Sequence, residues 1–430
     1  MGPGRGQIGQ PTHGLWEKTA PPLWLESYSG SSSTDVVVVG GGYTGLSSAL
    51  HLRELGVSVT VLEAVDVGFG ASGRNVGLVN AGLWLPPEDV VKALGSERGE
   101  SLLELLSHAP DRVFELARQF EMQCEPDRNG TLNLAVGRKG LRSLEARYSQ
   151  WKRRGAPVEL LDARQTRARS GSSRYAGSLL DMRAGTVQPL GYARGLAKAA
   201  ISTGAQVYVN SAVEKVERTA SRWRVSTARG QVDADWVIVA TDTYSTGAWN
   251  SVGQELISLP YFNVATEPLP EAVLSTVMPG RHGSWDTQTV LTSFRTDRAG
   301  RLIFGSVGAL RGLGTMIHRA FARRAIHTHF PQLADYEFEC EWYGSIGMTS
   351  DNVPRFHQFD RNISGFSGYN GRGIAPGTAF GRVLARYVTG QMRDEELPLP
   401  VTPLRAASLR GVREKSYEFG AQLAHLVATR

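Results

Sequence analysis

The chain has 430 residues, a length that favours two domains or one interleaved pair, and its 41% hydrophobic and 20% charged residues are typical of a globular protein. Its net charge is +6, but the densest run of Lys and Arg, at 152–154, is only three residues long, which argues against a nucleic-acid-binding patch. Two cysteines make no disulfide framework, no metal-type spacing of His and Cys occurs, and no apolar run reaches the ~18 residues of a transmembrane helix.

The first strong pattern covers residues 35–63 and predicts a strand, a tight turn, a helix and a second strand. Four consecutive valines, 36–39, are typical of a strand buried on both faces of a parallel sheet. A G-x-G-x-x-G motif follows and consists of Gly40, Gly42 and Gly45. In such a motif the glycines permit the turn, the approach of a pyrophosphate and the packing of helix on strand. A helix from Thr44 and a strand over 57–62 complete a dinucleotide-binding unit.

Glu63 ends the second strand, 18 residues after Gly45, where an acceptor for a ribose 2′-hydroxyl is expected. The N-terminus of the predicted helix offers free N–H groups and a positive dipole end, which suit phosphate. An acidic residue rather than Arg at this place argues against NADP. The unit alone leaves NAD and FAD as open alternatives.

A glycine-dense loop follows over residues 65–84, and its polar members include Ser72, Arg74 and Asn75. In a dinucleotide fold this place lies near the ribityl and ring end of a flavin, although an ordinary surface loop is the alternative. Between the loop and residue 233 the pattern predicts helices over 86–120 (broken at Pro110), 140–154, 160–169 and 190–203, strands over 131–136, 176–181, 184–187 and 207–209, and a hairpin of 222–227 with 231–233.

The chain resembles the D-amino-acid oxidase (DAO) superfamily of FAD-dependent amine oxidoreductases. The strings that carry the resemblance are GGGYTGLSSALHLRELG at 40–56, VTVLEA at 59–64 and GFGASGRN at 68–75. Within the superfamily the chain is most similar to the γ-glutamylputrescine oxidoreductase and bacterial L-pipecolate oxidase branch. The strings shared with the pipecolate oxidases are ASGRNVGLVNAG, GSWDT, GRLIFGS and GYNGRG. The resemblance covers about residues 15–390.

The second half of the chain is predicted to supply the substrate domain. An apolar strand over 235–241 is expected to rejoin the first sheet and to place Ala240 and Thr241 near the adenosine part of the cofactor. A β-rich region then runs from 245 to 341. Its predicted elements are strands over 261–265, 289–294 and 301–306, the turn 296–300, a helix over 315–329 and a strand over 339–348.

The order of strand, glycine-rich turn and helix that begins residues 35–63 occurs again near the C-terminus, with a predicted strand over 363–368, a turn over 369–373 and a helix over 378–389. The resemblance implies that this turn faces the pyrimidine edge of a flavin, where a helix N-terminus stabilises negative charge. An NAD enzyme needs only the first turn, so two such turns favour FAD. We expect FAD to be held non-covalently, because Cys340 is not clearly at the position of the cysteine that links flavin in relatives.

We predict an α/β fold with an α+β second domain, in which a Rossmann-like FAD-binding domain is interleaved with a β-sheet substrate domain that covers the flavin. The predicted divisions are an N-terminal arm (1–30), a discontinuous FAD-binding domain (31–110, 171–245 and 345–400), a substrate domain (111–170 and 246–344) and a C-terminal helical tail (401–430).

The motifs and the resemblance together predict a set of cofactor-binding residues. They are Gly40, Gly42, Tyr43, Thr44, Gly45, Glu63, Ala64, Gly70, Ala71, Ser72, Gly73, Arg74, Asn75, Val76, Val213, Ala240, Thr241, Gly344, Tyr369, Asn370, Gly371, Arg372, Gly373 and Ile374.

The expected reaction moves a hydride from a carbon that bears nitrogen to the flavin and yields an imine. An aromatic wall favours the neutral amine, and the candidates for it include Tyr261, Trp285 and Trp342, with core packing as the alternative for each. In sarcosine-oxidase relatives a Lys follows the C-terminal turn, but this chain has Ala375 there. Arg372, then Arg295 and Arg74, are the predicted substitutes for binding a substrate carboxylate.

The electron acceptor stays open between molecular oxygen and a carrier such as a quinone. The relatives use a Lys for reaction with oxygen, but the chain has seven lysines and none lies between Lys215 and Lys415. The expected substrate is a cyclic secondary amino acid such as L-pipecolate, and the alternative is a γ-glutamylputrescine-type amine. We predict a cytoplasmic enzyme that binds no nucleic acid, and leave its oligomeric state and a peripheral contact with a membrane surface open. A nucleic-acid-binding module is a disfavoured alternative, because the positive charge is unclustered.

Overall fold

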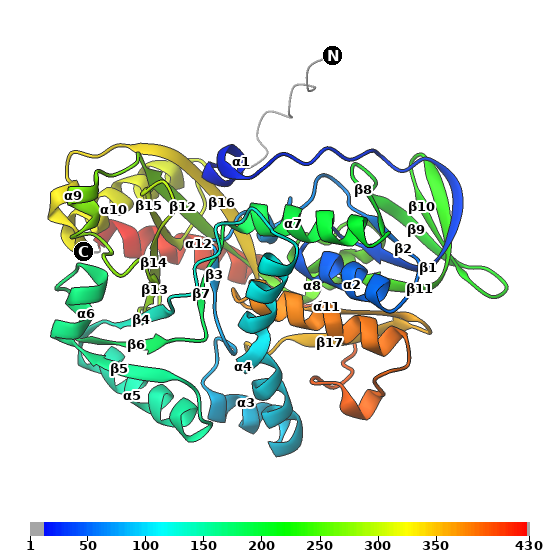
Figure 1. Ribbon diagram of the computed structural model, residues 1–430, viewed down its shortest axis with the longest axis horizontal. Helices are drawn as coiled ribbons and strands as arrows, with labels where there is room; N and C mark the ends of the chain where they lie inside the picture. The colour runs from blue at the N-terminus through cyan, green and yellow to red at the C-terminus, as the bar shows by residue number, and fades with distance from the viewer. Residues whose placement is uncertain (1–12, 428–430) are drawn as a thin grey trace, which may run out of the picture.

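A computed structural model describes residues 13–427, which form two large sheets side by side with helices around them (Figure 1). The first sheet is mostly parallel and has the order β17-β18-β11-β1-β2-β8, with β10 and β9 added to β11. Its strands are β1 (Gly30–Val39), β2 (Val59–Leu62), β8 (Gln206–Tyr208), β9 (Val213–Arg218), β10 (Trp223–Thr227), β11 (Gly230–Val239), β17 (Arg355–Asp360) and β18 (Ile363–Ser367).

The valines of β1 divide between the two faces of the first sheet, because successive side chains of a strand point in opposite directions. Val36 and Val38 join the large core beneath the helices, whereas Val37 and Val39 join a separate core with Val225 of β10. This burial on both faces confirms the prediction made from the run of valines.

The second sheet is mostly antiparallel and has the order β16-β12-β15-β14-β13-β4-β6-β5, and β3 pairs with β7 in a small ribbon. The strands are β3 (Leu78–Val79), β4 (Thr131–Ala135), β5 (Val158–Asp162), β6 (Gly177–Asp181), β7 (Gly185–Thr186), β12 (Ile257–Thr266), β13 (Gly283–Asp286), β14 (Thr292–Thr296), β15 (Leu302–Val307) and β16 (Phe338–Met348). The mixed α/β class is therefore confirmed. The domain limits stay a prediction, and β6, which lies in a segment assigned to the FAD-binding domain, belongs to the second sheet.

Twelve α-helices surround the sheets within residues 13–427. They are α1 (Leu15–Thr19), α2 (Tyr43–Glu54), α3 (Pro87–Leu94), α4 (Ser96–Gln119), α5 (Gly137–Arg153), α6 (Ala163–Ser170), α7 (Pro189–Ser202), α8 (Asn250–Glu255), α9 (Glu271–Leu274), α10 (Leu313–His329), α11 (Ile374–Val388) and α12 (Arg410–Val427). Short 3-10 turns are η1 (Ala71–Gly73), η2 (Asp242–Tyr244), η3 (Gly247–Trp249), η4 (Pro331–Leu333) and η5 (Asp394–Glu396).

The prediction that the helix over 86–120 breaks at Pro110 is wrong, because α4 passes through this residue without interruption. The break between α3 and α4 lies instead at Gly95, whose φ is 82°. A proline removes the N–H that would bond the carbonyl four residues earlier. Here the carbonyl of Leu106 accepts a hydrogen bond from the backbone N–H of Gly82 at 3.0 Å, so tertiary structure supplies the missing donor.

Three further elements differ from the sequence prediction. Residues 160–162 end β5, and the helix after them begins at Ala163 because Asp162 caps it and forms a capping box with Gln165. The second hairpin strand, predicted over 231–233, and the apolar strand predicted over 235–241 form one continuous strand, β11. It pairs with β10 at its start and with β18 at its end. The helix predicted over 378–389 begins at Ile374 instead.

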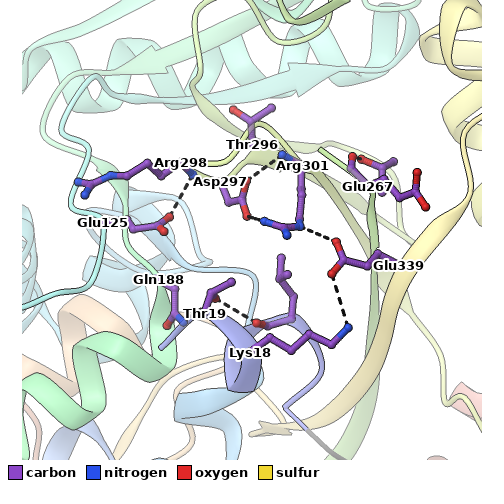
Figure 2. Close-up of polar contacts among 12 residues, drawn as sticks. Lys18, Thr19, Glu125, Gln188, Glu267, Thr296, Asp297, Arg298, Arg301 and Glu339 are labelled. Carbon is purple, nitrogen blue, oxygen red and sulfur yellow. Dashed lines mark hydrogen bonds and ion pairs between the residues drawn. The ribbon is translucent and has the colours of Figure 1, made fainter. Parts of the chain in front are cut away.

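The N-terminal helix α1 is fixed to the second sheet by a chain of polar contacts (Figure 2). Lys18 lies 3.5 Å from Glu339 of β16, which accepts a hydrogen bond from Arg301 at 2.6 Å. Trp16 is fully buried and donates to the carbonyl of Asn75 at 2.9 Å. Helix α1 thereby braces the glycine-rich loop before the chain runs across to β1 (Figure 1). Residues 1–12 of the predicted arm and 428–430 of the predicted tail lie outside the described residues.

The hydrogen bond from Gly82 to the carbonyl of Leu106 leads to a prediction for the variant Pro110→Ala. A proline in an ordinary helix interior costs about 3 kcal/mol, so its removal normally stabilises. We expect no increase in the free energy of unfolding here, because the orphaned carbonyl is already bonded and Ala fills less of the buried space. Urea unfolding of the FAD-loaded protein, followed by tryptophan fluorescence, measures this. An increase of about 2 kcal/mol or more in the variant would contradict it.

Candidate functional site

A cavity of about 620 Å³ lies between the two sheets, where the carboxyl ends of β1, β2 and β11 meet the second sheet. Ligands of parallel α/β sheets bind at this end of the strands. Val39 and Leu62 line the cavity from the first sheet, and Tyr261 and Ser293 line it from the second. The site therefore runs from a Rossmann-type turn at one end to a β-sheet wall at the other.

The first end of the cavity is built by the predicted glycine motif. Gly40 has a φ of 111°, and a Cβ atom there would lie 2.6 Å from the carbonyl oxygen of Ala240. Gly42 is the N-cap of α2 and supplies no side chain to cap the helix. Gly45 packs so closely on Gly40 that a side chain would overlap its carbonyl. The start of α2 lines the cavity, and its first N–H, that of Tyr43, donates to the hydroxyl of Ser72 at 3.2 Å. The following N–H groups, of Thr44 and Gly45, are those that suit a phosphate at a helix N-terminus.

Glu63 lies at the end of β2 with its carboxylate turned back to the turn. It accepts hydrogen bonds from the N–H of Gly41 at 2.6 Å and from the N–H of Val65 at 3.0 Å. Burial raises the pKa of Glu63 above its usual value, and these N–H donors oppose that rise. The carboxylate lines the cavity and keeps capacity for a further donor, such as a ribose hydroxyl.

Hydrogen-bond donors within the glycine-rich loop and on the second sheet hold the backbone of this loop in place. The Nδ2 of Asn75 donates to the carbonyls of Ala71 and Ser72, each at 3.0 Å. The carbonyl of Arg74 accepts from Trp342 at 3.0 Å and from Asn263 at 3.2 Å, so the second sheet fixes this backbone. The guanidinium of Arg74 lies 4.4 Å from the ring centroid of Phe69.

The C-terminal glycine turn forms the third wall. Asn370 has a φ of 52°, and its side chain accepts from the N–H of Thr349 at 2.8 Å, which fixes the turn. The hydroxyls of Tyr369 and Thr44 lie 2.5 Å apart and join this turn to α2. Gly373 is the N-cap of α11 and again offers no capping side chain. A second uncapped helix N-terminus therefore lines the same cavity.

These features fit FAD. Two uncapped helix N-termini suit a pyrophosphate and the electron-rich edge of a flavin ring, and a carboxylate suits a ribose. A side chain at Gly40 or Gly45 would collide with the backbone that shapes the cavity. Neither Cys124 nor Cys340 lines the cavity, and the non-covalent attachment of FAD stays a prediction.

Arg372 is a cation of the C-terminal glycine turn and lines the cavity. Its side chain is buried, donates to the carbonyl of Ala81 at 2.7 Å and lies 5.2 Å from the ring centroid of Trp285. No carboxylate within residues 13–427 forms an ion pair with it, and its buried Nε has no hydrogen-bond partner there. Burial and then the neighbouring charge of Arg147 lower the pKa of Arg372 to about 9. This environment leaves the guanidinium ready to bind an anion.

A family model described as FAD dependent oxidoreductase (DAO) matches residues 35–387. The chain belongs to this family. It is therefore an FAD-dependent oxidoreductase, and the predicted superfamily, cofactor and enzyme class are confirmed.

Two curated relatives of this DAO-family chain match it over most of their length. The γ-glutamylputrescine oxidoreductase of Escherichia coli K12 is 36% identical over 375 residues, which cover 85% of this chain and 86% of the relative. The probable oxidoreductase OrdL of Haemophilus influenzae is 31% identical and covers 85% of this chain and 84% of its own.

Solved structures share the fold. Glycine oxidase from Geobacillus kaustophilus superposes with a TM-score of 0.69 at 21% identity, covering 86% of this chain and 98% of that one. L-proline dehydrogenase from P. horikoshii gives a TM-score of 0.69 at 16% identity, covering 87% and 96%. These likenesses confirm the DAO fold.

The cavity collects nearly all of the predicted cofactor-binding residues. Only Gly45 and Gly73 of that set do not line it, and both pack against backbone instead. Among the predicted catalytic residues, Arg372, Arg74, Tyr261 and Trp285 line the cavity. The roles of all these residues in binding and catalysis stay predictions.

Two predicted catalytic residues lie outside the cavity. Arg295 is buried two residues beyond Ser293 on the same strand, where it donates to the carbonyl of Val187 and lies 5.6 Å from the ring of Trp16. Trp342 likewise lies two residues before the cavity-lining Gly344 and donates to the loop. Each is two residues from a lining residue and therefore points to the same face of its strand, but it lies beyond the end of the cavity. Both side chains support the loop and do not face the cavity.

Several lining residues were not predicted. The carboxylate of Asp242 accepts from the N–H of Gly368 at 2.7 Å, and burial raises the pKa of Asp242. The hydroxyl of Tyr244 accepts from the N–H of Ser345 at 2.9 Å. The others of note are Phe69, Asn80, Trp84 and Ser293. Asp242 and Tyr244 come just after Ala240 and Thr241, the small residues that follow β11, and this position in the sequence could have identified them as lining residues.

Residues 13–427 contain neither a candidate membrane-spanning helix nor a cluster of side chains suited to a metal ion. None of their helices has the length and apolar run needed to cross a membrane. No group of three or more His, Cys, Asp or Glu side chains among them is placed to hold a metal ion.

Glu63→Gln tests the ribose acceptor. We expect it to weaken FAD binding at pH 7 by about 10- to 100-fold, because a hydrogen bond to a charged acceptor contributes about 1.5–3 kcal/mol. Because the pKa of Glu63 is raised, the wild type should protonate this residue at a higher pH than an ordinary Glu as the pH falls, and should then lose FAD. The affinity of the variant for FAD should not depend on pH in this way. Flavin fluorescence on release measures both, with Glu54→Gln as the control. Equal affinities of wild type and Glu63→Gln would contradict the assignment.

Proposed function

We propose that this chain oxidises an amine whose molecule also carries a carboxylate, and that Arg372 binds this carboxylate. The observation that carries the proposal is a buried guanidinium in the cavity wall that has no acidic partner within residues 13–427. A buried charge is costly unless it is paired, so a site of this kind favours an anionic ligand.

The side chains around Arg372 favour the reactive form of the amine. When bound, FAD supplies the hydride acceptor, and the oxidised substrate leaves as an imine that hydrolyses or cyclises. Trp285 and Tyr261 line the same end of the cavity, and the hydroxyl of Tyr261 lies 2.7 Å from that of Ser293. The acids that line the cavity, Glu63 and Asp242, are bonded to backbone N–H groups near the glycine turns. An apolar end without an acid, beside a cation, lowers the pKa of an ammonium and favours the free amine.

The N-terminus of α11, which directly follows Arg372 and Gly373, also contributes. Its first N–H groups follow Gly373 and face the cavity without a capping side chain. They favour the negative charge that the ring system gains in the reaction, because their positive partial charges are already oriented. The Asn370 and Tyr369 contacts hold this turn in place before the substrate arrives.

Two substrates fit the proposal. The relative that is 36% identical is a γ-glutamylputrescine oxidoreductase, and γ-glutamylputrescine has both an amine and a carboxylate. L-pipecolate also has both, but it is supported only by the short strings that resemble pipecolate oxidases. We therefore place the γ-glutamylated amine first and L-pipecolate second.

The acceptor and the location also stay proposals. No lysine lines the cavity, so Arg74 or Arg372 must provide any cation that helps oxygen react. We propose oxygen as the acceptor, with a quinone as the alternative, in a cytoplasmic enzyme.

The direct test is anaerobic titration of the FAD-loaded protein with γ-glutamylputrescine, L-pipecolate, putrescine and piperidine. We expect one carboxylate-bearing amine to bleach the flavin absorbance at a much lower concentration than its counterpart without the carboxylate. Readmitted air then identifies the acceptor, because rapid recovery with peroxide indicates oxygen. A protein that binds FAD but is reduced by none of these amines would contradict the proposal.

Arg372→Gln gives a second prediction. A charge-assisted hydrogen bond contributes about 1.5–3 kcal/mol, so KM for the carboxylate substrate should rise by about 10- to 100-fold, while the amine without a carboxylate is little affected. Because burial lowers the pKa of Arg372 to about 9, the wild-type preference in kcat/KM for the carboxylate substrate over the amine without a carboxylate should decline as the pH rises above this value. Arg386→Gln, an exposed arginine on α11, the helix that follows the turn of Arg372, is the matched control. An unchanged preference for the carboxylate in Arg372→Gln would contradict its role.

A further inference from the structure

The C-terminal helix α12 turns its apolar side outward. Its buried residues are Ala421 and His425. In contrast, Phe419 is 61% exposed and Val427 is 75% exposed. Tyr417 of α12 is 40% exposed, and the more exposed apolar residues of this helix are Val412, Phe419, Leu423, Leu426 and Val427, with Leu409 before them. A helix that only packs on its own domain shows the opposite arrangement, with its apolar side inward.

These residues form one stripe. The steps from Val412 to Phe419, to Leu423 and to Leu426 are seven, four and three residues, which place side chains on one side of an α-helix. Ala421 lies two residues from Phe419 and Leu423, on the opposite side. The apolar stripe therefore faces away from the second sheet.

Polar contacts attach the inward side of α12 to the protein. Glu414 accepts a hydrogen bond from the N–H of Ser258 in β12 at 2.9 Å. Glu418 pairs with Arg311 at 2.6 Å, and His425 lies 2.8 Å from His318 of α10 between their Nδ1 atoms. The helix is thus fixed without use of its stripe.

The start of α10 extends the apolar surface. Leu313 is 70% exposed and Met316 is 66% exposed. The two helices pack against each other, and Figure 1 shows α12 (red) beside α10 at the end of the molecule that carries the second sheet. More than half of the exposed large apolar side chains of residues 13–427 lie on these two segments. A concentration of this kind marks a contact surface.

The charges around the stripe indicate what covers it. Glu414 and Glu418 are engaged by Arg410 and Arg311. Within residues 13–427 no ion pair is formed by Arg405, Arg413 or Lys415, which flank the stripe. A second copy of the chain would bring the same cations and no free acid on this face. An anionic lipid surface complements both the cations and the apolar side chains.

We propose that α12, with the start of α10, lies in the headgroup region of a bilayer that contains anionic lipids. A helix of 18 residues is about 27 Å long and can lie flat in this interface, with Phe419 and Leu423 among the acyl chains and Arg413 and Lys415 at the phosphates. This docking is independent of the substrate that the cavity takes. It holds the enzyme peripherally at the membrane surface.

The test is flotation of the full-length, FAD-loaded protein with vesicles. We expect it to float with phosphatidylcholine vesicles that contain phosphatidylglycerol, and much less with phosphatidylcholine alone, and salt should weaken the binding. The double variant Phe419→Ser/Leu423→Ser should lower partitioning by about tenfold or more. Arg413→Gln/Lys415→Gln should remove the preference for anionic vesicles. The control is Trp24→Ser, which changes an apolar residue that is 86% exposed elsewhere.

Three results would overturn the proposal: no flotation with anionic vesicles, equal flotation of Phe419→Ser/Leu423→Ser and wild type, or a stable dimer by light scattering that the double variant converts to a monomer. The last would show that a second copy covers the stripe. Bound flavin absorbance and circular dichroism of each variant establish that it is folded.

Discussion

The close packing of α2 on α11 is the contact on which the rest of the site depends. These helices come from opposite ends of the chain, and they approach because Gly377 and Gly381 have no side chains. A Cβ atom at Gly381 would lie 2.5 Å from the Cβ of Ser47. The hydroxyl of Ser47 instead donates to the carbonyl of Thr378 at 2.7 Å. This contact brings two uncapped helix N-termini to one cavity, and a cofactor with a phosphate end and an electron-rich ring can span them.

The second sheet contributes by holding the loop between these two helix ends. Trp16, Asn263 and Trp342 all donate to the backbone of residues 74–75, so Arg74 is presented from a fixed loop. Such bracing positions the wall of the cavity before any ligand enters, which is the condition for electrostatic catalysis. Arg372 benefits in the same way, because its guanidinium is held by the carbonyl of Ala81 against Trp285.

The sequence was informative where one local pattern determines the structure. The glycine motif, the acidic end of β2 and the second glycine turn predicted the FAD site, because each function needs those residue types at that spacing. It was uninformative where partners lie far apart in the chain. Pro110 does not break α4, because the N–H of Gly82 donates to the carbonyl that the proline leaves unpaired. Arg295 and Trp342 point to the same face of their strands as lining residues, but they lie beyond the end of the cavity. The outward stripe of α12 was invisible because its periodicity does not say which side faces the core.

The central claim is that one cavity holds FAD between the two helix ends and the substrate carboxylate at Arg372. A crystal structure of the FAD-loaded protein with an unreactive carboxylate analogue of its best substrate tests this claim most directly. We expect pyrophosphate at the N-terminus of α2, the flavin ring at the N-terminus of α11, and the analogue's carboxylate on Arg372. A carboxylate bound to Arg74 instead, or a flavin ring remote from α11, would contradict it.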